Sequence, residues 1–308
     1  MRFASLCSVL AVASFVALGA ACGDDGGKTP VDAKVEDIGF NKPTGVLKAN
    51  HEVSKNNWVE DGPADLSCLG TPSADVATTV AVALTTKVDD FQSGNAVPMT
   101  HVTVFPNQDT TAPFGPEVIG DGNAMLTVNI PVGTKRFGFK MTNPSSLETL
   151  LLNQTVEPGM ATQSIGHIQI VSTATAQTLP ALIGVSRTPL TGILAGAVRD
   201  CNKKEMSNYV ATVSSTDGTV THLPGVDTYY FSASVGLPVR HSQQDFSSKN
   251  GLFMAIEMAP TATAYVQVWG YKTQADLDAD HLTLIAQLKT AVIADVVITG
   301  SYDPLRSN

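Results

Sequence analysis

The chain has 308 residues, a formal net charge of −9, 43% hydrophobic residues and 15% charged residues. The negative charge argues against nucleic acid as a partner, because binding to nucleic acid is favoured by clustered Lys and Arg. The length leaves room for two domains of about 100–150 residues each, and the hydrophobic fraction is enough to build a core in both.

Residues 1–21 are typical of a signal peptide. Arg2 precedes an apolar run that ends at Leu18 and is too short to span a bilayer. The small residues Gly-Ala-Ala then precede Cys22, as at a lipoprotein cleavage site, although Leu18 stands one place earlier than the usual leucine. We predict a lipoprotein signal peptide and lipidation of Cys22. Cleavage by an ordinary signal peptidase is the alternative.

Residues 22–75 are predicted to form a flexible tether and lead-in. The stretch GDDGGKTPVDAK directly after Cys22 lacks large apolar residues and cannot build a core. A tether in this place suits a lipid-anchored protein, so the predicted localisation is the cell envelope, and the membrane is the first predicted partner.

The cysteine count favours one disulfide. Of four cysteines, Cys7 leaves with the signal peptide and Cys22 would carry the lipid. Cys68 and Cys201 remain, in a chain routed to an oxidising compartment, where unpaired cysteines are uncommon. We predict that they form a disulfide, and two buried free thiols are the alternative.

Two-residue alternation predicts a first β-sandwich over residues 76–172. Apolar residues alternate with polar ones in TVAVAL, HVTVF, AMLTVNIP and KRFGFKM, as in half-buried antiparallel strands. Turn sequences such as Asp121-Gly122 separate these strands. The next segment, residues 173–188, does not alternate, and it predicts a linker or short helix with Gly184 as a C-cap.

Seven further strand candidates between Gly192 and Gly300 predict a second β-sandwich over residues 189–303. Asp217-Gly218 and Asn250-Gly251 mark turns between them. The predicted fold class is therefore all-β, with two tandem antiparallel β-sandwiches.

One strand of the second sandwich carries the best candidate for a ligand-binding surface. In AYVQVWGY, Val266 and Val268 alternate with four other residues: Tyr265, Gln267, Trp269 and Tyr271. If the valines face the core, these four residues form an outward aromatic stripe that could stack on sugar rings. The alternatives are that the stripe packs beneath a loop or the other domain, or is itself the core face.

The sequence offers little catalytic chemistry. It has no glycine-rich phosphate loop and no His-Glu-x-x-His motif, and its six histidines are scattered. Asp276, Asp278 and Asp280 have the spacing of the start of a calcium loop, but His281 and Gln287 stand where that loop needs Gly and Glu. We predict no enzyme activity, no cofactor and no metal site.

Two stretches resemble the carboxypeptidase regulatory-like domain, a transthyretin-type sandwich. The stretch VPMTHVTVFP and the later DGNAMLTVNIPVGTKRFGFKMT follow its order of strands and turns, including Asp121-Gly122 and Pro131-x-Gly133. GAVRDC and Asn250-Gly251 follow the same order in the second half, where the glycine expected after Pro260 is missing. The chain thus resembles a Gram-negative lipoprotein with two such domains in tandem. This resemblance implies two seven-stranded antiparallel sandwiches of the Ig-like or transthyretin-like kind, and it favours the outer membrane as the location.

The resemblance implies a structural, adhesive or carbohydrate-contacting module, by analogy of fold alone. We predict a non-catalytic cell-envelope lipoprotein that displays two β-sandwiches, with another envelope protein as a possible partner. The alternative is a carbohydrate-binding module that holds a polysaccharide on the aromatic stripe.

Overall fold

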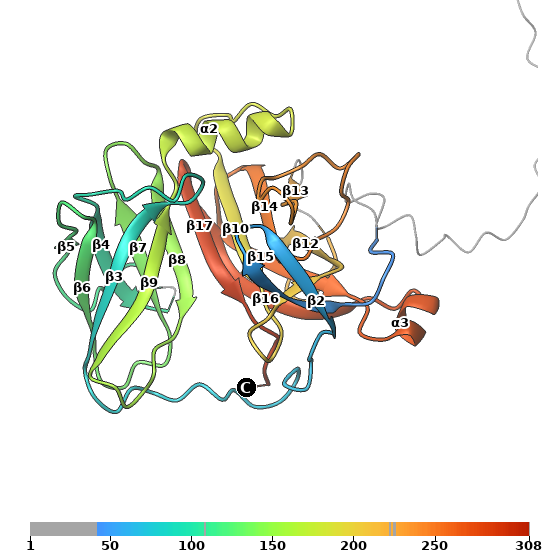
Figure 1. The fold of residues 1–308 in the computed structure, drawn as a ribbon, viewed down its shortest axis with the longest axis horizontal. Coiled ribbons are helices and arrows are strands. Elements are labelled where there is room, and N and C mark those ends of the chain that lie inside the picture. Colours follow the sequence, from blue (N-terminus) through green and yellow to red (C-terminus); the bar gives the residue numbers. More distant parts are fainter. Residues whose placement is uncertain (1–41, 108, 222, 224–225, 308) are drawn as a thin grey trace, which may run out of the picture.

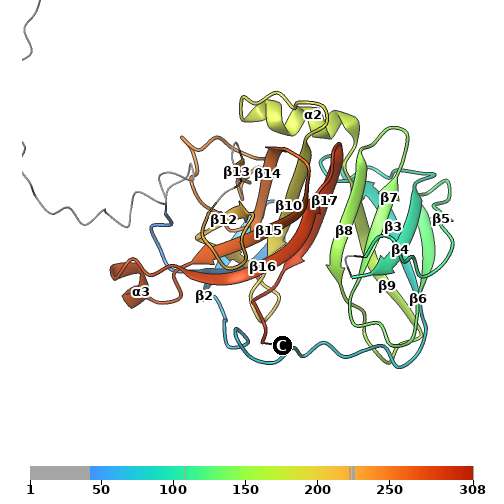
Figure 2. The ribbon, with the colours of Figure 1, turned by 180° about the vertical axis from the view of Figure 1, so that it is seen from behind.

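The computed structural model describes residues 42–107, 109–221, 223 and 226–307, and nearly all of the regular secondary structure in them is β-strand. The predicted all-β class is confirmed. Figures 1 and 2 show two sandwiches side by side, with one helix lying across one end of their junction.

The first sandwich, on the left in Figure 1, pairs the sheet β6-β3-β9 with a layer of strands β5-β4-β7-β8. The alternation seen in the sequence sets its core, because Leu84, Val128 and Phe139 from both layers are at most 2% exposed. The strands are β3 (Val82–Asp90), β4 (His101–Pro106), β5 (Val118–Ile119), β6 (Met125–Ile130), β7 (Phe137–Thr142), β8 (Glu148–Gln154) and β9 (Thr162–Ile170).

The second sandwich packs strands β13-β14-β10-β17 against the sheet β12-β15-β16. Phe253, Val266 and Ile298 meet in its core and are at most 2% exposed. The strands are β10 (Gly192–Val198), β12 (Tyr209–Ser214), β13 (Asp227–Tyr230), β14 (Leu252–Met258), β15 (Thr261–Gly270), β16 (Thr283–Val292) and β17 (Val296–Tyr302). A short helix, α3 (Gln274–Asp278), connects β15 to β16.

The two sandwiches share one continuous sheet. The last strand, β17, lies between β10 and β8 and pairs with both in parallel, with Val296 opposite Glu148 and Gly300 opposite Leu152. This pairing gives an eight-stranded sheet in the order β13-β14-β10-β17-β8-β7-β4-β5. β3 and β9 also pair in parallel, so the ladders depart from the purely antiparallel arrangement predicted.

The first described segment belongs to the second sandwich. β1 (Lys48–Ser54) and β2 (Asn57–Pro63) form a hairpin, and β1 also pairs with β11 (Glu205–Ser207). Leu47, just before the hairpin, is 1% exposed and packs into the core of the second sandwich. The prediction of a flexible tether over 22–75 is therefore wrong for the hairpin, because an apolar anchor and strand pairing hold it. Residues 22–41 lie outside the described residues.

A strap then runs from the hairpin to the first sandwich along the lower edge of the molecule in Figure 1. It covers residues 64–81. Its backbone exchanges hydrogen bonds with the C-terminal segment, from the N–H of Gly70 to the carbonyl of Leu305 (2.8 Å) and from the N–H of Ser307 to the carbonyl of Thr71 (2.9 Å). The N–H of Thr78 then donates to the carbonyl of Thr134 in the first sandwich (2.9 Å).

The segment predicted to be a linker or short helix contains the helix α2 (Thr173–Leu182). The Ser172 side chain accepts a hydrogen bond from the N–H of Thr175 and caps the first turn. Gly184, just past the end, has a φ of +84°, which is the left-handed conformation expected of a C-cap glycine. Among the described residues, no helix is long and apolar enough to cross a membrane.

Candidate functional site

The aromatic stripe is mostly buried, so the predicted exposed sugar-binding surface is wrong. Gln267 is 0% exposed, Tyr271 2% and Trp269 8%, and Tyr265 is half-buried. Val266 faces the core of the second sandwich, as expected. The opposite face is covered as well, because Trp269 packs with a cluster of apolar residues from neighbouring segments, namely Val210, Val220, Phe246, Leu282 and Leu284.

The polar groups of the stripe are used inside the protein. The Gln267 side-chain amide donates to the carbonyl of Thr216 and to Oε1 of Gln287, both at 3.0 Å. Its Oε1 accepts a hydrogen bond from the Trp269 indole (3.3 Å). The Tyr271 hydroxyl donates to Oδ1 of Asp280 (2.6 Å). A face of this kind stabilises the fold and has no open aromatic surface for a sugar.

Cys68 and Cys201 form the disulfide that the cysteine count favoured, with their Cα atoms 5.8 Å apart. It ties the strap to the loop between β10 and β11. Asp200 strengthens the same joint, because its Oδ2 accepts a hydrogen bond from the N–H of Asp65 (3.0 Å). Cys22, the predicted lipidation site, lies outside the described residues.

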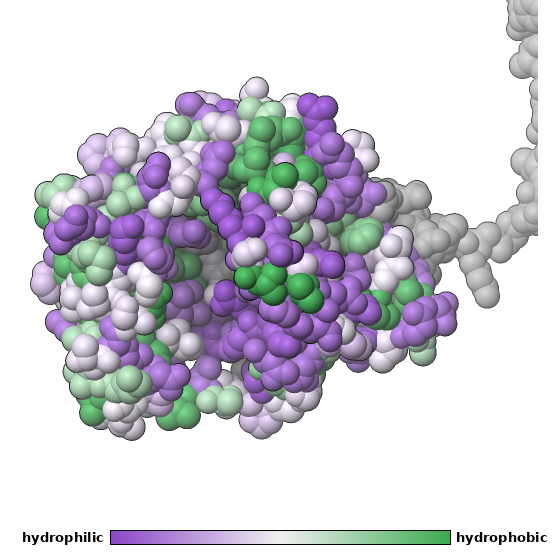
Figure 3. Space-filling view, viewed as in Figure 1, coloured by the Kyte–Doolittle hydropathy of each residue, from purple (hydrophilic) through white to green (hydrophobic). Residues whose placement is uncertain are grey.

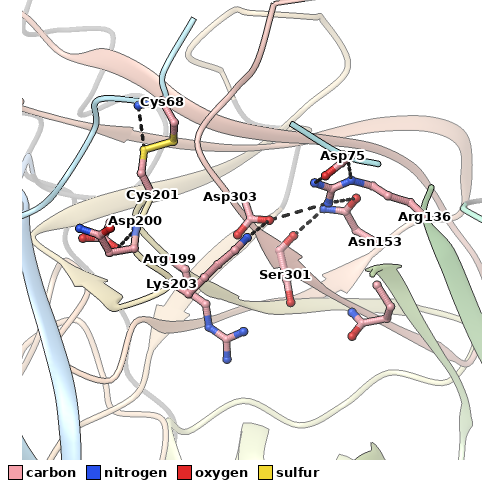
Figure 4. A network of polar contacts seen from close by, with 12 residues as sticks. Cys68, Asp75, Arg136, Asn153, Arg199, Asp200, Cys201, Lys203, Ser301 and Asp303 are labelled. Atoms are coloured by element: carbon pink, nitrogen blue, oxygen red, sulfur yellow. Dashed lines mark hydrogen bonds and ion pairs between the residues drawn. A yellow bond between two sulfur atoms is a disulfide. The ribbon is translucent and has the colours of Figure 1, made fainter. Parts of the chain in front are cut away.

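A polar network centred on Arg136 links the strap to both sandwiches (Figure 4). Arg136 stands just before β7 and forms two hydrogen bonds with the Asp75 carboxylate of the strap. It also donates to Oδ1 of Asn153 on β8 (2.7 Å), and the Asn153 amide donates to the carbonyl of Ser301 on β17 (2.9 Å). Asp303 lies 3.7 Å from Arg136 and 3.0 Å from Nζ of Lys203.

The charge of Asp75 is stabilised by this arrangement. Burial raises the pKa of its carboxyl, but the hydrogen bonds and the charge of Arg136 outweigh burial, and the pKa lies below its usual value. No sequence pattern predicted this network, because its members come from five separate segments and none belongs to a motif.

A second ion pair lies at the edge of the second sandwich. Nε2 of His241 is 2.8 Å from Oδ1 of Asp227, and the imidazole stacks on the Tyr229 ring with centroids 4.7 Å apart. The hydrogen bond with Asp227 raises the pKa of His241, despite the opposing effect of burial. In the described part of the chain, no group of three or more His, Cys, Asp or Glu side chains could hold a metal ion.

A groove lies between the two sandwiches and has a volume of about 380 Å³. Its floor is the face of β8, β17, β10 and β14 that is turned away from the core of the second sandwich, and its walls are β9 and α2. Figure 3 shows the molecule hollowed at this place. The groove could not be predicted from the sequence, because its floor forms only when β8 pairs with β17. These two strands are about 150 residues apart in the chain.

Comparison with known proteins leaves the family open. No protein-family model and no curated protein matches the chain. Among solved structures, the TIE protein of Bacillus anthracis is 11% identical with a TM-score of 0.24, and the match covers 73% of this chain and 34% of that one. This chain therefore spans about a third of the length of the TIE protein.

Two other solved structures illustrate the range of matches. The shaft pilin SpaA of Lactobacillus rhamnosus GG is 11% identical with a TM-score of 0.21, over 74% of this chain and 98% of that one. The 3-chlorocatechol 1,2-dioxygenase of Rhodococcus opacus 1CP is 10% identical with a TM-score of 0.22, over 47% of this chain and 79% of that one. Scores this low carry no argument about function, and the all-β class rests on the strands themselves.

Proposed function

We propose that the protein is a non-catalytic lipoprotein of the cell envelope, in the outer membrane, that displays two β-sandwiches as one rigid body. The shared eight-stranded sheet is the observation that supports this proposal most strongly. A shared sheet, a disulfide and the Arg136 network all oppose movement between the sandwiches. Such coupling suits a spacer or a contact surface better than a hinged ligand clamp.

The resemblance to carboxypeptidase regulatory-like domains belongs with this proposal, since such domains serve as structural or adhesive modules. Lipid on Cys22 would attach the protein to the membrane, and another envelope protein is the partner expected for a displayed body of this kind. The described chain begins at the second sandwich, so that sandwich would lie nearer to the anchor.

Fractionation of cells that produce the full chain tests the proposal. The expected result is that the protein is found in the membrane fraction and that its N-terminal peptide begins at a lipid-modified Cys22. The variant C22S is expected to lose the membrane attachment, whereas the control C7S, in the predicted signal peptide, is expected to keep it. An unmodified N-terminal peptide in the soluble fraction would contradict lipid anchoring.

A further inference from the structure

The groove between the sandwiches has an apolar end that is closed by α2. Met254 and Val297 on the floor face Leu179 of the helix, and all three are less than 9% exposed. Further along the floor, Ala195, Ala197 and Leu252 are half-buried, although they lie in the middle of a sheet. Ala195 and Leu252 pack against the apolar cluster that includes Leu179 of α2, and Ala197 lines the groove beside them.

The opposite end of the groove is polar. β8, β17 and β10 run parallel to one another, so their C-terminal ends meet at the same edge of the floor. These ends place three polar side chains along the groove: Gln154, Ser301 and Arg199. Strand residues rise about 3.3 Å each, so the floor from Ile193 to Arg199 is about 20 Å long and changes from apolar to polar along its length.

At this polar end, Arg199 has guanidinium N–H groups that are available to donate hydrogen bonds to a ligand. Its Nε lies 3.2 Å from Oε1 of Glu205, and the described residues supply no other hydrogen-bond partner for its two terminal nitrogens. In Figure 4 the side chain points away from the network around Asp303 and Lys203. A guanidinium with two open N–H-bearing nitrogens is suited to bind a carboxylate or a phosphate oxygen pair.

We propose that the groove binds a single-chain amphiphile with an anionic head, such as a fatty acid. The acyl chain lies over Ala195 and Ala197 with its end beneath α2, and the head accepts hydrogen bonds from Arg199. The volume of about 380 Å³ falls within the range of about 300–1,000 Å³ that is usual for small-molecule pockets. The acyl chain suits the apolar end of the groove and the anionic head suits the polar end. This binding role is independent of the proposed display function.

Titration of the purified protein with dodecanoate and with dodecyltrimethylammonium, below their micellar concentrations, tests the proposal by calorimetry. Dodecanoate is expected to bind, and the cation at least tenfold more weakly. The variant R199Q is expected to weaken dodecanoate binding about tenfold, as is usual for loss of a charge-assisted hydrogen bond. The matched control K203Q removes a neighbouring exposed positive charge and is expected to leave the affinity within twofold.

A second pair of variants tests the position of the chain. A197F fills the middle of the floor and is expected to weaken dodecanoate binding more than tenfold, with the Tm of the protein measured alongside. A262F places the same ring on an exposed position of β15 and is expected to change nothing. Failure of dodecanoate to bind, equal binding of the cation, equal losses in R199Q and K203Q, or full binding in a stably folded A197F would each overturn the proposal.

Discussion

Asp90 joins the end of β3 to the start of α2. Asp90 is only 7% exposed. Its carboxylate accepts hydrogen bonds from the N–H and the hydroxyl of Ser93 (2.9 Å each), from the N–H of Ser172 (3.0 Å) and from the hydroxyl of Thr175 (3.0 Å). Burial raises the pKa of Asp90, but these hydrogen bonds outweigh burial and hold the pKa at about 2.

A depressed pKa makes the stabilising effect of Asp90 sensitive to acid. Its contribution is complete above the usual aspartate pKa of about 3.9 and is lost as the pH falls towards 2. D90N is therefore expected to cost about 1.5–3 kcal/mol at pH 7 and less at pH 2.5. Urea unfolding at the two pH values measures this difference. The exposed control D278N is expected to show neither effect, and an equal loss in D90N at both pH values would refute the assignment.

The Asp227–His241 pair contributes stability that is lost as the pH rises. Because the pKa of His241 is raised, its stabilising effect is complete below the usual histidine pKa of about 6.5 and is lost as the pH rises through the raised value. H241Q is expected to lower the Tm at pH 6 more than at pH 9. H281Q, at a side chain 72% exposed, is the matched control. A Tm loss that is the same at both pH values would indicate packing alone.

At the scale of elements, the β1–β2 hairpin is held to the second sandwich by Leu47. There is no room for a Cβ at Gly270, because it would lie 2.6 Å from Cδ2 of Leu47, so the leucine fills this contact closely. L47A is expected to lower the free energy of unfolding by about 2–4 kcal/mol. V53A, on the same hairpin but 52% exposed, is expected to change it by less than about 0.5 kcal/mol. Similar losses in both variants would contradict the anchoring role of Leu47.

The disulfide closes a loop of 133 residues that contains the whole first sandwich. The loss of such a loop constraint from the unfolded chain costs up to roughly 4–5 kcal/mol. The double variant C68S/C201S is expected to unfold at lower urea concentration, and the reduced natural protein is expected to match it. A double variant as stable as the oxidised protein would show that the strap and the shared sheet already fix this geometry.

The sequence was sufficient to predict the helix α2 and most of the strands. It was not sufficient to predict which strands pair with one another. Period-two alternation found most of the strands from Val82 onward, and the lack of alternation found α2. Alternation did not find β8 and β9, which line the groove, or the short strands β5 and β11. The stripe around Trp269 misled because alternation tells only which residues share a face, and both faces of β15 are covered. The pairing of β17 with β8 leaves no local pattern, since parallel neighbours here are about 150 residues apart, and the groove could not be foreseen without it.

At the scale of the whole molecule, the chain path ties the two sandwiches together several times. It starts in the second sandwich with β1 and β2, crosses to the first along the strap, and returns through α2 (Figure 2). β17, the last strand, then closes the shared sheet. Each crossing adds contacts that would be lost if one sandwich unfolded while the other stayed folded.

Differential scanning calorimetry of the oxidised protein tests most directly whether the two sandwiches form one rigid body, as we propose. We expect a single transition in which the calorimetric and van't Hoff enthalpies agree, as for one cooperative unit. Two resolved transitions, or a calorimetric enthalpy about twice the van't Hoff value, would mean that the sandwiches unfold independently and would contradict the claim.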